Sequence, residues 1–410
     1  MQDGEPVVLW PDYRGPAWDG HAPEGAQVPL SWSEEENVAW KTEIWGRGWS
    51  SPVVDDDTVW LTTADPEGHE RAVMALSLET GEVLLDRVLF EVEEPEFRND
   101  LNSYASPSCV LDGERVFVLF GSLGIACLDA KSHELLWERT DLNCDHMMGP
   151  GSSPLLLDGR VIVHYDGGDV QYVVSLDAKN GETVWRQERS YDFTGVADDL
   201  RKAYGTPVPV RGEARTVLVS TGAQVTYGYD AADGKELWQV RHKGFSMSAR
   251  PIVSGGLALV NTGFMRAELW ALRLGGEGDV TESHVAWNVN KGIATMATGV
   301  VVGDLVFQVT DGGIVSCIDL ATGENHWRER VTDEVCASML AVGDRVYLSD
   351  RVGKTVVFAA KPELEVLAEN HLDDGCMASH AVADGALLVR TKTHLYRLEQ
   401  GAKGEGERER

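Results

Sequence analysis

DAKNGETVW, at residues 177–185, decides the fold of this chain, because its spacing recurs along the sequence. The related segments are SLETGEVLL from Ser77, DAKSHELLW from Asp129, DAADGKELW from Asp230 and DLATGENHW from Asp319. In each segment a turn residue, usually Gly, follows the first position by four residues, and Trp or Leu follows by four more. Glycine accepts the positive φ of a tight turn, Asp and Thr bond backbone N–H groups, and Trp fills the space between sheets. The pattern predicts a repeated β-hairpin with a structural Trp.

Each hairpin unit begins with an opening motif, usually a small residue followed by Pro. The openings start at Ser51, Ser106, Ser153, Thr206, Arg250, Thr298, Ser338 and Ser379. Their separations of about 40 to 55 residues are typical of a four-stranded propeller blade, and the 3.6-residue periodicity of a helical repeat is absent. The sequence therefore predicts an all-β, eight-bladed β-propeller with four-stranded antiparallel blades.

The eighth unit lacks one strand, because the chain after Ser379 supplies only three apolar runs before a polar tail. The segment Asn37–Lys41, NVAWK, has the apolar-plus-Trp character of the missing strand. We therefore predict that a strand around Trp40 closes the ring and removes both sheet edges. This divides the chain into an N-terminal arm (1–36), the propeller (37–400) and a disordered charged tail (401–410). In the seventh unit, Leu367 is the candidate for the Trp position.

Composition excludes several classes of partner. The formal net charge of -30 opposes non-specific binding to nucleic acid and to anionic membranes. No apolar stretch reaches the roughly 18 residues that a membrane span requires. The six cysteines show no metal-ligand spacing, and Cys109, Cys127 and Cys317 lie in apolar runs that predict buried free thiols. We therefore predict no nucleic acid partner, no membrane span and no metal site.

The closing segments resemble the repeats of quinoprotein (pyrroloquinoline quinone, PQQ) dehydrogenases and of the outer-membrane assembly lipoprotein that shares their propeller. WPDYRGP (10–16), GRGWSSPVV (46–54) and LNSYASPS (101–108) are more similar to exported PQQ-like propellers that are common in planctomycetes. The resemblance implies a periplasmic or extracellular protein. The N-terminus MQDGEP lacks the apolar region of a leader, but a mature exported protein with an added Met would begin in the same way.

A quinone dehydrogenase of this type would carry a vicinal Cys pair, Ca²⁺ ligands from Glu, Asn and Asp, and a Trp floor beneath PQQ. This sequence has no vicinal Cys pair, and none of its segments matches the Ca²⁺ ligands. PQQ is therefore suggested by the repeats alone, and we predict that the chain uses no cofactor.

One member of the ring of openings differs from the rest, because Arg250 is charged where the other seven are small. Small residues are expected where eight strands converge. An Arg there either pairs with an internal carboxylate, such as Glu334 or Asp145, or binds an anion through its guanidinium group. The sequence leaves both interpretations open.

Three entry loops share a polar-x-aromatic pattern just before the openings. The pairs are Arg47 with Trp49, Asn102 with Tyr104, and Lys202 with Tyr204. Flat apolar surfaces beside cations and an amide suit sugars, uronates and aromatic anions. We therefore predict a monomeric, non-catalytic protein whose funnel face, including Arg250, binds an anionic glycan or other carbohydrate, another anionic small molecule, or a protein partner.

The alternative function is a glycan-active enzyme of the polysaccharide lyase type. Arg or Lys would neutralise a uronate, and His146, Tyr104 or Tyr204 would move a proton. A PQQ-dependent dehydrogenase is a further alternative. Three cysteines in entry loops, Cys144, Cys336 and Cys376, lie at positions that could approach His380, but their spacing has no zinc signature and does not decide whether they are free thiols.

Overall fold

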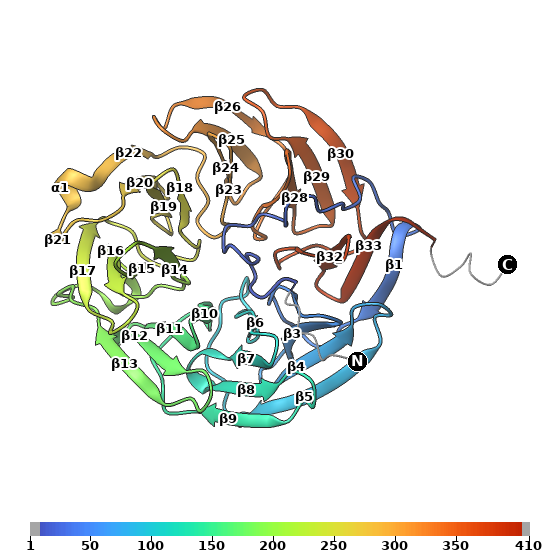
Figure 1. The fold of residues 1–410 in the computed structure, drawn as a ribbon, viewed down its shortest axis with the longest axis horizontal. Coiled ribbons are helices and arrows are strands. Elements are labelled where there is room, and N and C mark those ends of the chain that lie inside the picture. Colours follow the sequence, from blue (N-terminus) through green and yellow to red (C-terminus); the bar gives the residue numbers. More distant parts are fainter. Residues whose placement is uncertain (1–8, 404–410) are drawn as a thin grey trace.

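Strands of the computed structural model, which describes residues 9–403, are arranged as eight sheets around one axis (Figure 1). Blade 1 consists of β2 (Val53–Val54), β3 (Thr58–Ala64), β4 (Glu70–Ser77) and β5 (Val83–Glu91). Blade 2 consists of β6 (Val110–Leu111), β7 (Arg115–Leu119), β8 (Ile125–Asp129) and β9 (Leu135–Arg139). Blade 3 consists of β10 (Leu155–Leu157), β11 (Arg160–Asp166), β12 (Gln171–Asp177) and β13 (Thr183–Glu188). Blade 4 consists of β14 (Val208–Arg211), β15 (Thr216–Gly222), β16 (Val225–Asp230) and β17 (Glu236–Arg241), with β21 (Gly278–Asp279) added.

The second half of the ring repeats the same order. Blade 5 consists of β18 (Ile252–Ser254), β19 (Leu257–Asn261), β20 (Leu269–Arg273) and β22 (Val285–Val289). Blade 6 consists of β23 (Val300–Val302), β24 (Leu305–Val309), β25 (Ile314–Asp319) and β26 (Asn325–Arg330). Blade 7 consists of β27 (Leu340–Val342), β28 (Arg345–Ser349), β29 (Lys354–Ala359) and β30 (Val366–His371). Blade 8 consists of β31 (Ala381–Ala383), β32 (Ala386–Arg390), β33 (His394–Lys403) and β1 (Glu36–Glu43).

The predicted eight-bladed architecture is confirmed, with one addition. Within each blade, successive strands pair antiparallel, but β21 pairs parallel with β17 and gives blade 4 a fifth strand. A four-residue helix, α1 (Thr281–His284), follows β21. A short 3₁₀ turn at Gly121–Leu123 connects β7 and β8 in blade 2. A second, at Asp198–Leu200, lies in the loop before blade 4.

The N-terminal strand closes the ring as predicted. β1 pairs antiparallel with β33, and Trp40 lies opposite Arg397, so the two ends of the chain meet in blade 8 (Figure 1). β33 extends through Lys403, so residues 401–403 are strand rather than the predicted disordered tail. The remainder of the predicted tail, 404–410, lies outside the described residues.

The recurring Trp and Gly form one interlocking unit between neighbouring blades. Trp137 donates its Nε1 hydrogen to the Ala178 carbonyl of the next blade at 3.1 Å. Gly181 beneath it has a φ of +73°, and a Cβ there would lie 2.6 Å from the Trp137 ring. Blade 1 has Leu85 instead of Trp, and there the next turn accommodates His133 at a φ of 62°. The repeat motif therefore encodes contacts between blades as well as the turn itself.

The prediction that Leu367 replaces Trp in blade 7 was wrong. The turn into β30 is one residue longer than in the blades with the Trp motif, so that Ala368 pairs with Val357 at the Trp position, while the side chain of Leu367 is 36% exposed. The arm instead supplies Trp32, which stacks on Tyr347 with ring centroids 6.3 Å apart, in the apolar cluster shared by blades 7 and 8.

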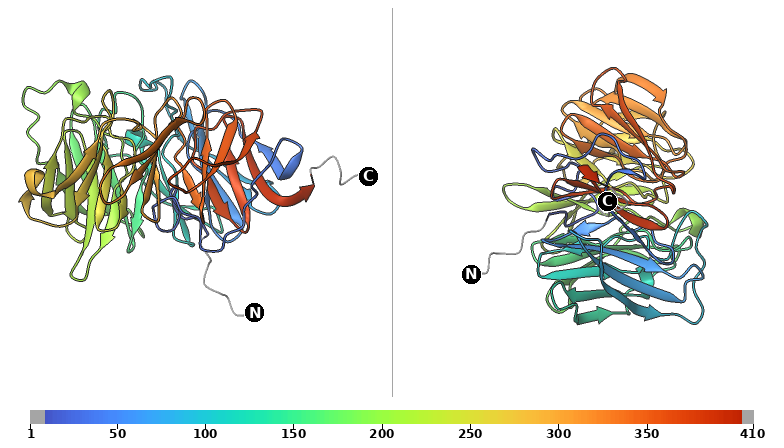
Figure 2. Two further views of the ribbon diagram at one scale, coloured as in Figure 1. Left: turned by 90° about the horizontal axis from the view of Figure 1, so that it is seen from above. Right: turned by 90° about the vertical axis from the view of Figure 1, so that its right-hand side faces the viewer.

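The N-terminal arm crosses the axis before it reaches β1. Trp10 forms a bridge with Val54 at the start of blade 1, and His21 forms one with Ala341 in blade 7. In Figure 1 the arm runs from the centre of the ring toward blades 7 and 8. One side of the ring is therefore covered by the arm. The long loops before blades 3 and 4 rise from the other side (Figure 2, left), which we call the loop face.

Candidate functional site

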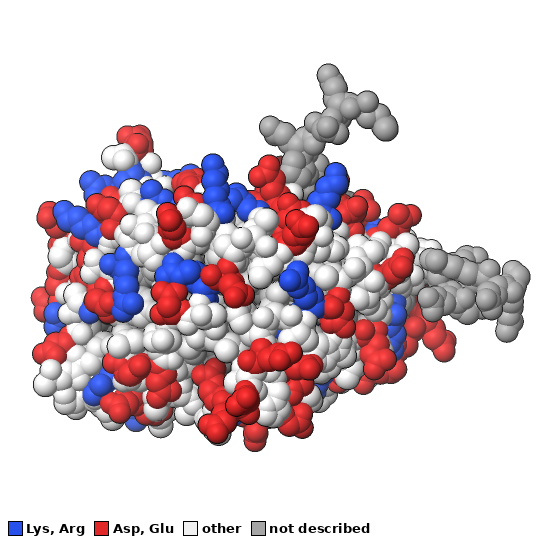
Figure 3. All heavy atoms as spheres, turned by 90° about the horizontal axis from the view of Figure 1, so that it is seen from below, with Lys and Arg blue, Asp and Glu red and all other residues white. Residues whose placement is uncertain are grey.

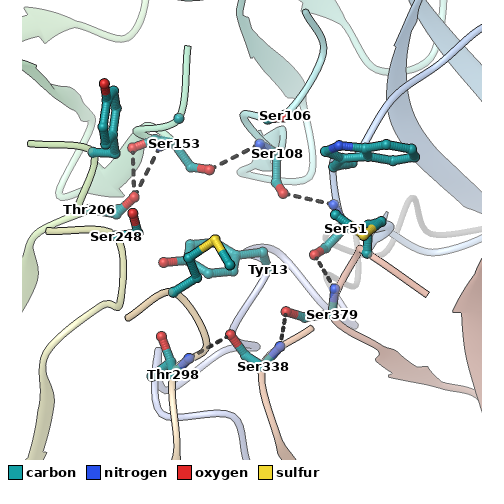
Figure 4. A pocket seen from close by; sticks show the side chains of 15 residues that line it. Tyr13, Ser51, Ser106, Ser108, Ser153, Thr206, Ser248, Thr298, Ser338 and Ser379 are labelled. Atoms are coloured by element: carbon teal, nitrogen blue, oxygen red, sulfur yellow. Dashed lines mark hydrogen bonds between the residues drawn. The ribbon is translucent and has the colours of Figure 1, made fainter. Parts of the chain in front are cut away.

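A ring of hydroxyl groups surrounds the propeller axis on the loop face. Seven backbone N–H groups donate to the hydroxyl oxygen of the next blade's opening residue, at 2.8 to 3.2 Å (Figure 4). The hydroxyls belong to Ser51, Ser108, Ser153, Thr206, Thr298, Ser338 and Ser379. The innermost strands are thus held together by local bonds that any Ser or Thr can make.

The predicted register was wrong in blade 2. Ser108, rather than Ser106, occupies the ring, because Leu111 pairs with Val116 in the register that Val54 and Val59 have in blade 1. The Ser-Pro dipeptide of blade 2 therefore lies two residues earlier than its counterparts. This shift moves Tyr104 out of the aromatic position, which Ser106 takes instead.

The ring opens into a small cavity of about 120 Å³. Apart from the hydroxyl residues, its lining includes Tyr13, Trp49, Tyr204, Met296 and Met377 (Figure 4). Pockets for drug-sized ligands usually have volumes of about 300 to 1,000 Å³. The axial cavity therefore accommodates a few atoms of a ligand rather than a whole cofactor.

Residues of the arm close the axis from the opposite side. Tyr13 lies within the circle of hydroxyl groups (Figure 4). Arg14 is buried and donates to the carbonyls of Met339 at 2.6 Å and Gly299 at 2.8 Å, in blades 7 and 6. The sequence could not predict these contacts, because Arg14 binds backbone carbonyls of residues far away in the chain.

Arg250 belongs to this closure and points away from the cavity lining. Its guanidinium group is 1% exposed and donates to Asp12 Oδ1 at 2.7 Å and to the Pro207 carbonyl at 2.8 and 3.1 Å. Of the two interpretations left open by the sequence, the structure shows an internal ion pair. Its partner is neither Glu334 nor Asp145 but the arm residue Asp12.

Two of the predicted rim residues lie at the mouth of the cavity. Trp49 lines it, with the Arg47 guanidinium 5.0 Å from the ring centroid, and Arg47 also donates to the Asp100 carbonyl. Tyr204 lines it from the other side and donates its hydroxyl to the His146 carbonyl at 2.7 Å. The binding roles of Arg47, Trp49 and Tyr204 stay a prediction.

The other predicted rim residues hold loops in place. Asn102 donates to the carbonyls of Met148 and Pro150 at 2.9 and 3.0 Å. Tyr104 is buried between two guanidinium groups, with Arg71 at 4.2 Å from its ring centroid and Arg98 at 5.2 Å.

Lys202 is also buried, and it forms an ion pair with Asp199. The expected cluster of Arg47, Lys202 and Arg250 on one rim is therefore not formed. Lys202 and Arg250 each form an ion pair with a carboxylate instead.

His146 lies inside the loop before blade 3 and not at its surface. Its ring is buried, with Nδ1 3.5 Å from Cys144 Sγ. Burial lowers the pKa of His146 to about 4 and raises the pKa of the Cys144 thiol above its usual range. Both groups are neutral near pH 7, so they do not form a thiolate–imidazolium pair. A role for His146 in proton transfer would require exposure that this loop does not provide.

The pH dependence of stability follows from this burial. In the folded protein the pKa of His146 is about 4, whereas a histidine of the unfolded chain has a pKa near 6.5. The stability that the neutral, buried His146 contributes is therefore complete above about pH 6.5 and is lost as the pH falls toward 4. For one proton the slope is about 1.4 kcal/mol per pH unit. We predict that His146→Asn flattens the pH dependence of the free energy of unfolding, measured with urea, by up to this amount per pH unit between pH 6.5 and 4.5.

A matched variant is His326→Asn, because His326 is exposed on β26. It should retain the pH dependence of the native protein. A native-like dependence in His146→Asn as well would contradict the assignment of this histidine as a buried neutral group.

The axial site does not fit PQQ, the cofactor that the repeats suggest. The cavity is small, its lining residues carry no charge that would pair with a multiply anionic quinone, and Tyr13 occupies the axis. Across residues 9–403, no group of three or more His, Cys, Asp or Glu residues is placed to hold a metal ion. The six cysteines, all within the described residues, are free thiols.

A larger cavity, of about 620 Å³, lies away from the axis where blades 8 and 1 meet. It is lined by Trp40, by Arg397 and by the carboxylates of Asp56, Asp57, Glu79, Asp384 and Glu399. Arg397 donates to the Leu78 carbonyl at 2.8 Å and forms an ion pair with Asp384, which neutralises its positive charge. The excess of carboxylates makes this cavity unsuitable for an anionic ligand.

Comparison with known proteins places the chain in a family. A family model described as outer membrane protein assembly factor BamB matches residues 98–205, 170–292 and 265–362. The assembly factor BamB of Moranella endobia is 24% identical over 275 residues, which cover 63% of this chain and 65% of the relative. The chain thus spans less than two thirds of the length of that curated relative.

Solved structures share the fold at low sequence identity. BamB from Moraxella catarrhalis has a TM-score of 0.61 at 14% identity, over 88% of this chain and 99% of that one. Quinohemoprotein alcohol dehydrogenase from Comamonas testosteroni has a TM-score of 0.68 at 12% identity, over 97% and 81%. None of the helices in residues 9–403 has the length and apolar character needed to cross a bilayer. The family model matches more than half of the length of this chain. The chain therefore belongs to the PQQ-like repeat propellers described as outer membrane protein assembly factor BamB.

Proposed function

We propose that this propeller is a non-catalytic scaffold that binds a protein partner through its loop face, outside the cytoplasm. The observation that carries the proposal is that the four most exposed large apolar side chains of residues 9–403, together with Leu101, lie on loops of that face. They are Phe97 (70% exposed), Leu101, Phe264, Met265 (77%) and Val352. Exposed apolar residues framed by polar loops are typical of protein interaction sites.

The construction of the ring supports a scaffold. The axis is closed by Tyr13 and Arg14 from the arm, and the axial cavity is too small for a typical whole ligand. The loops therefore offer the larger binding area on this face. The family name, assembly factor, describes proteins that act on other proteins, which agrees with such a surface.

The glycan and lyase alternatives receive less support. A uronate site needs cations that converge on the ligand, but Lys202 and Arg250 are buried in ion pairs. Proton transfer needs an accessible acid or base, but burial raises the pKa of Tyr204 beyond its usual range and lowers that of His146 to about 4. Trp49 with Arg47 is an aromatic and cationic pair at the cavity mouth.

Site-specific photo-crosslinking in intact cells tests the scaffold. A photoreactive residue at Phe97 or Val352 on the loop face is expected to trap a protein. The same residue at Glu114 or Asp158, in turns of the arm-covered side, is expected to trap none. The Phe97→Ser and Val352→Ser variants should weaken retention of the trapped protein at least about tenfold, because central apolar anchors dominate binding. Adducts from the arm-covered side alone would contradict the proposal.

A further inference from the structure

Two loops on the loop face join to form a rigid apolar projection at blade 5. The first is the loop that enters the blade, around Phe245, and the second is the tip between β19 and β20, which presents Phe264 (54% exposed) and Met265. Phe264 N–H donates to the Phe245 carbonyl at 2.9 Å, and the two rings meet edge to face with centroids 6.2 Å apart. Phe245 also bridges to Gly263, where a Cβ would clash with the Phe245 carbonyl. The exposed tip is therefore held in one conformation.

The backbone of this projection is strained at two positions. Ser246 has a φ of 53° and Met265 a φ of 68°, a region that residues other than Gly rarely adopt. Strain of this kind is found at ligand-binding segments. Gly at position 265 would relieve the strain. The side chain of Met265 is 77% exposed, so it adds little to the packed core that would offset the strain.

Three cations lie on loops at or next to the projection: Lys243 in the entry loop of blade 5, Arg266 in the tip, and Lys291 in the entry loop of blade 6. Lys243, Arg266 and Lys291 are all exposed, and none of them forms an ion pair with another residue in the range 9–403. We name these cations, together with Phe264 and Met265, the blade-5 patch. The formal net charge of the whole chain is -30, so the sign of this group of charges is opposite to that of the protein.

The loop before blade 2 presents the opposite charge on the same face. It exposes Phe97 among Glu93, Glu94 and Asp100. Figure 3 shows carboxylates gathered along the lower edge of the molecule in that view. The loop before blade 2 and the blade-5 patch therefore expose charges of opposite sign on the same face.

From this arrangement we infer that the blade-5 patch docks an acidic segment of the partner protein that carries apolar side chains. The inference rests on the proposed scaffold function. Phe264 and Met265 would contact the apolar residues, while the three cations complement the carboxylates around them. A flat anionic membrane fits less well, because it would also approach the acidic loop before blade 2, whereas a single segment contacts the patch alone.

The first experiment identifies what touches the patch. A photoreactive residue at Met265 of the full-length protein is used in intact cells, and the trapped peptide is sequenced by mass spectrometry. We expect a segment rich in Asp and Glu with Phe, Leu or Met among them. A trapped peptide that is basic or uncharged, or adducts with lipid alone, would overturn the inference.

The second experiment measures the contribution of the patch with a defined probe. The probe is a fluorescent peptide of alternating Glu and Phe, compared with one of alternating Lys and Phe and with phosphatidylglycerol vesicles. Charge reversal by Lys243→Glu, Arg266→Glu and Lys291→Glu together should weaken binding of the Glu-Phe peptide at least tenfold and reduce its salt dependence. Met265→Gly should weaken it as well, without a lower melting temperature, because the variant relieves strain.

The matched control is Leu84→Ser, which removes an exposed apolar side chain from the outer strand β5, away from the loops of the loop face. It should leave affinity for the Glu-Phe peptide unchanged. Equal effects of Leu84→Ser and Met265→Gly, or tighter binding of the vesicles or of the Lys-Phe peptide, would overturn the inference. If crosslinks from Phe97 and Val352 still trap a partner while the patch variants change nothing, the scaffold function stands and only the role of the patch fails.

Discussion

Removal of residues 1–41 is expected to abolish cooperative folding of the ring. The deletion exposes most of the edge of β33 and removes the buried Trp10, Trp32 and Trp40, each of which fills space between blades or at the axis. Truncation of one buried Trp typically costs about 3 to 5 kcal/mol. Three of them together are comparable to the entire stability of a typical protein, about 5 to 15 kcal/mol.

Circular dichroism and size-exclusion chromatography of the truncated protein measure this effect. An unpaired strand edge also favours association, so oligomers are expected along with loss of the thermal transition. Deletion of residues 1–8 serves as the control, because it leaves every contact of residues 9–403 in place. A peptide of residues 9–43, added separately, should restore the transition if closure is the cause. A monomer that lacks residues 1–41 and melts at the native temperature would refute closure by the arm.

Arg250→Ala is expected to destabilise the protein by about 3 to 5 kcal/mol. The substitution leaves Asp12 buried and without its ion pair, and a buried charge that loses its partner carries a penalty of this size. The second carboxylate oxygen of Asp12 has no other hydrogen-bond partner to compensate. The substitution also removes the two hydrogen bonds that the Pro207 carbonyl accepts from the same guanidinium group.

Chemical denaturation of a double-mutant cycle tests this pair. Asp12→Asn alone should also be destabilising, whereas Arg250→Met combined with Asp12→Asn should cost less than the sum of the two single changes. Arg211→Ala is the matched control in blade 4, because Arg211 pairs with Asp158 and both side chains are 60% exposed. Exposed pairs contribute about 0 to 1 kcal/mol, so Arg211→Ala should be nearly neutral. Equal losses for Arg250→Ala and Arg211→Ala would refute the buried pair.

Parts of the fold that depend on local spacing could be predicted from the sequence. The turn from Asp177 to Trp185 needs a residue that tolerates positive φ, a side chain that bonds backbone N–H groups and an aromatic residue, and all three are visible in the sequence. The closing strand was predictable because blade 8 lacked one apolar run and the segment at Trp40 had the matching character.

The candidate site was predicted less well, because it depends on register. A shift of two residues in blade 2 moved Tyr104 from the cavity rim into a stack between Arg71 and Arg98. The Ser-Pro dipeptide, which marks the opening in blades 1 and 3, gave no sign of this shift. A turn that is one residue longer in blade 7 misplaced Leu367 in the same way, since only strand pairing shows which residue faces the neighbouring blade.

By itself, the sequence determined the class of fold, the number of blades and the manner of closure, because each of these follows from repeated contacts between residues close together in the chain. Only the tertiary structure decided what lies at the axis. Asp12 meets Arg250 across 238 positions of sequence, and Arg14 meets the Met339 carbonyl across 325. The anomalous Arg250 indicated that a partner existed, but an ion pair requires no particular spacing. Its identity follows from the path of the arm through the ring, which brings Asp12 within bonding distance.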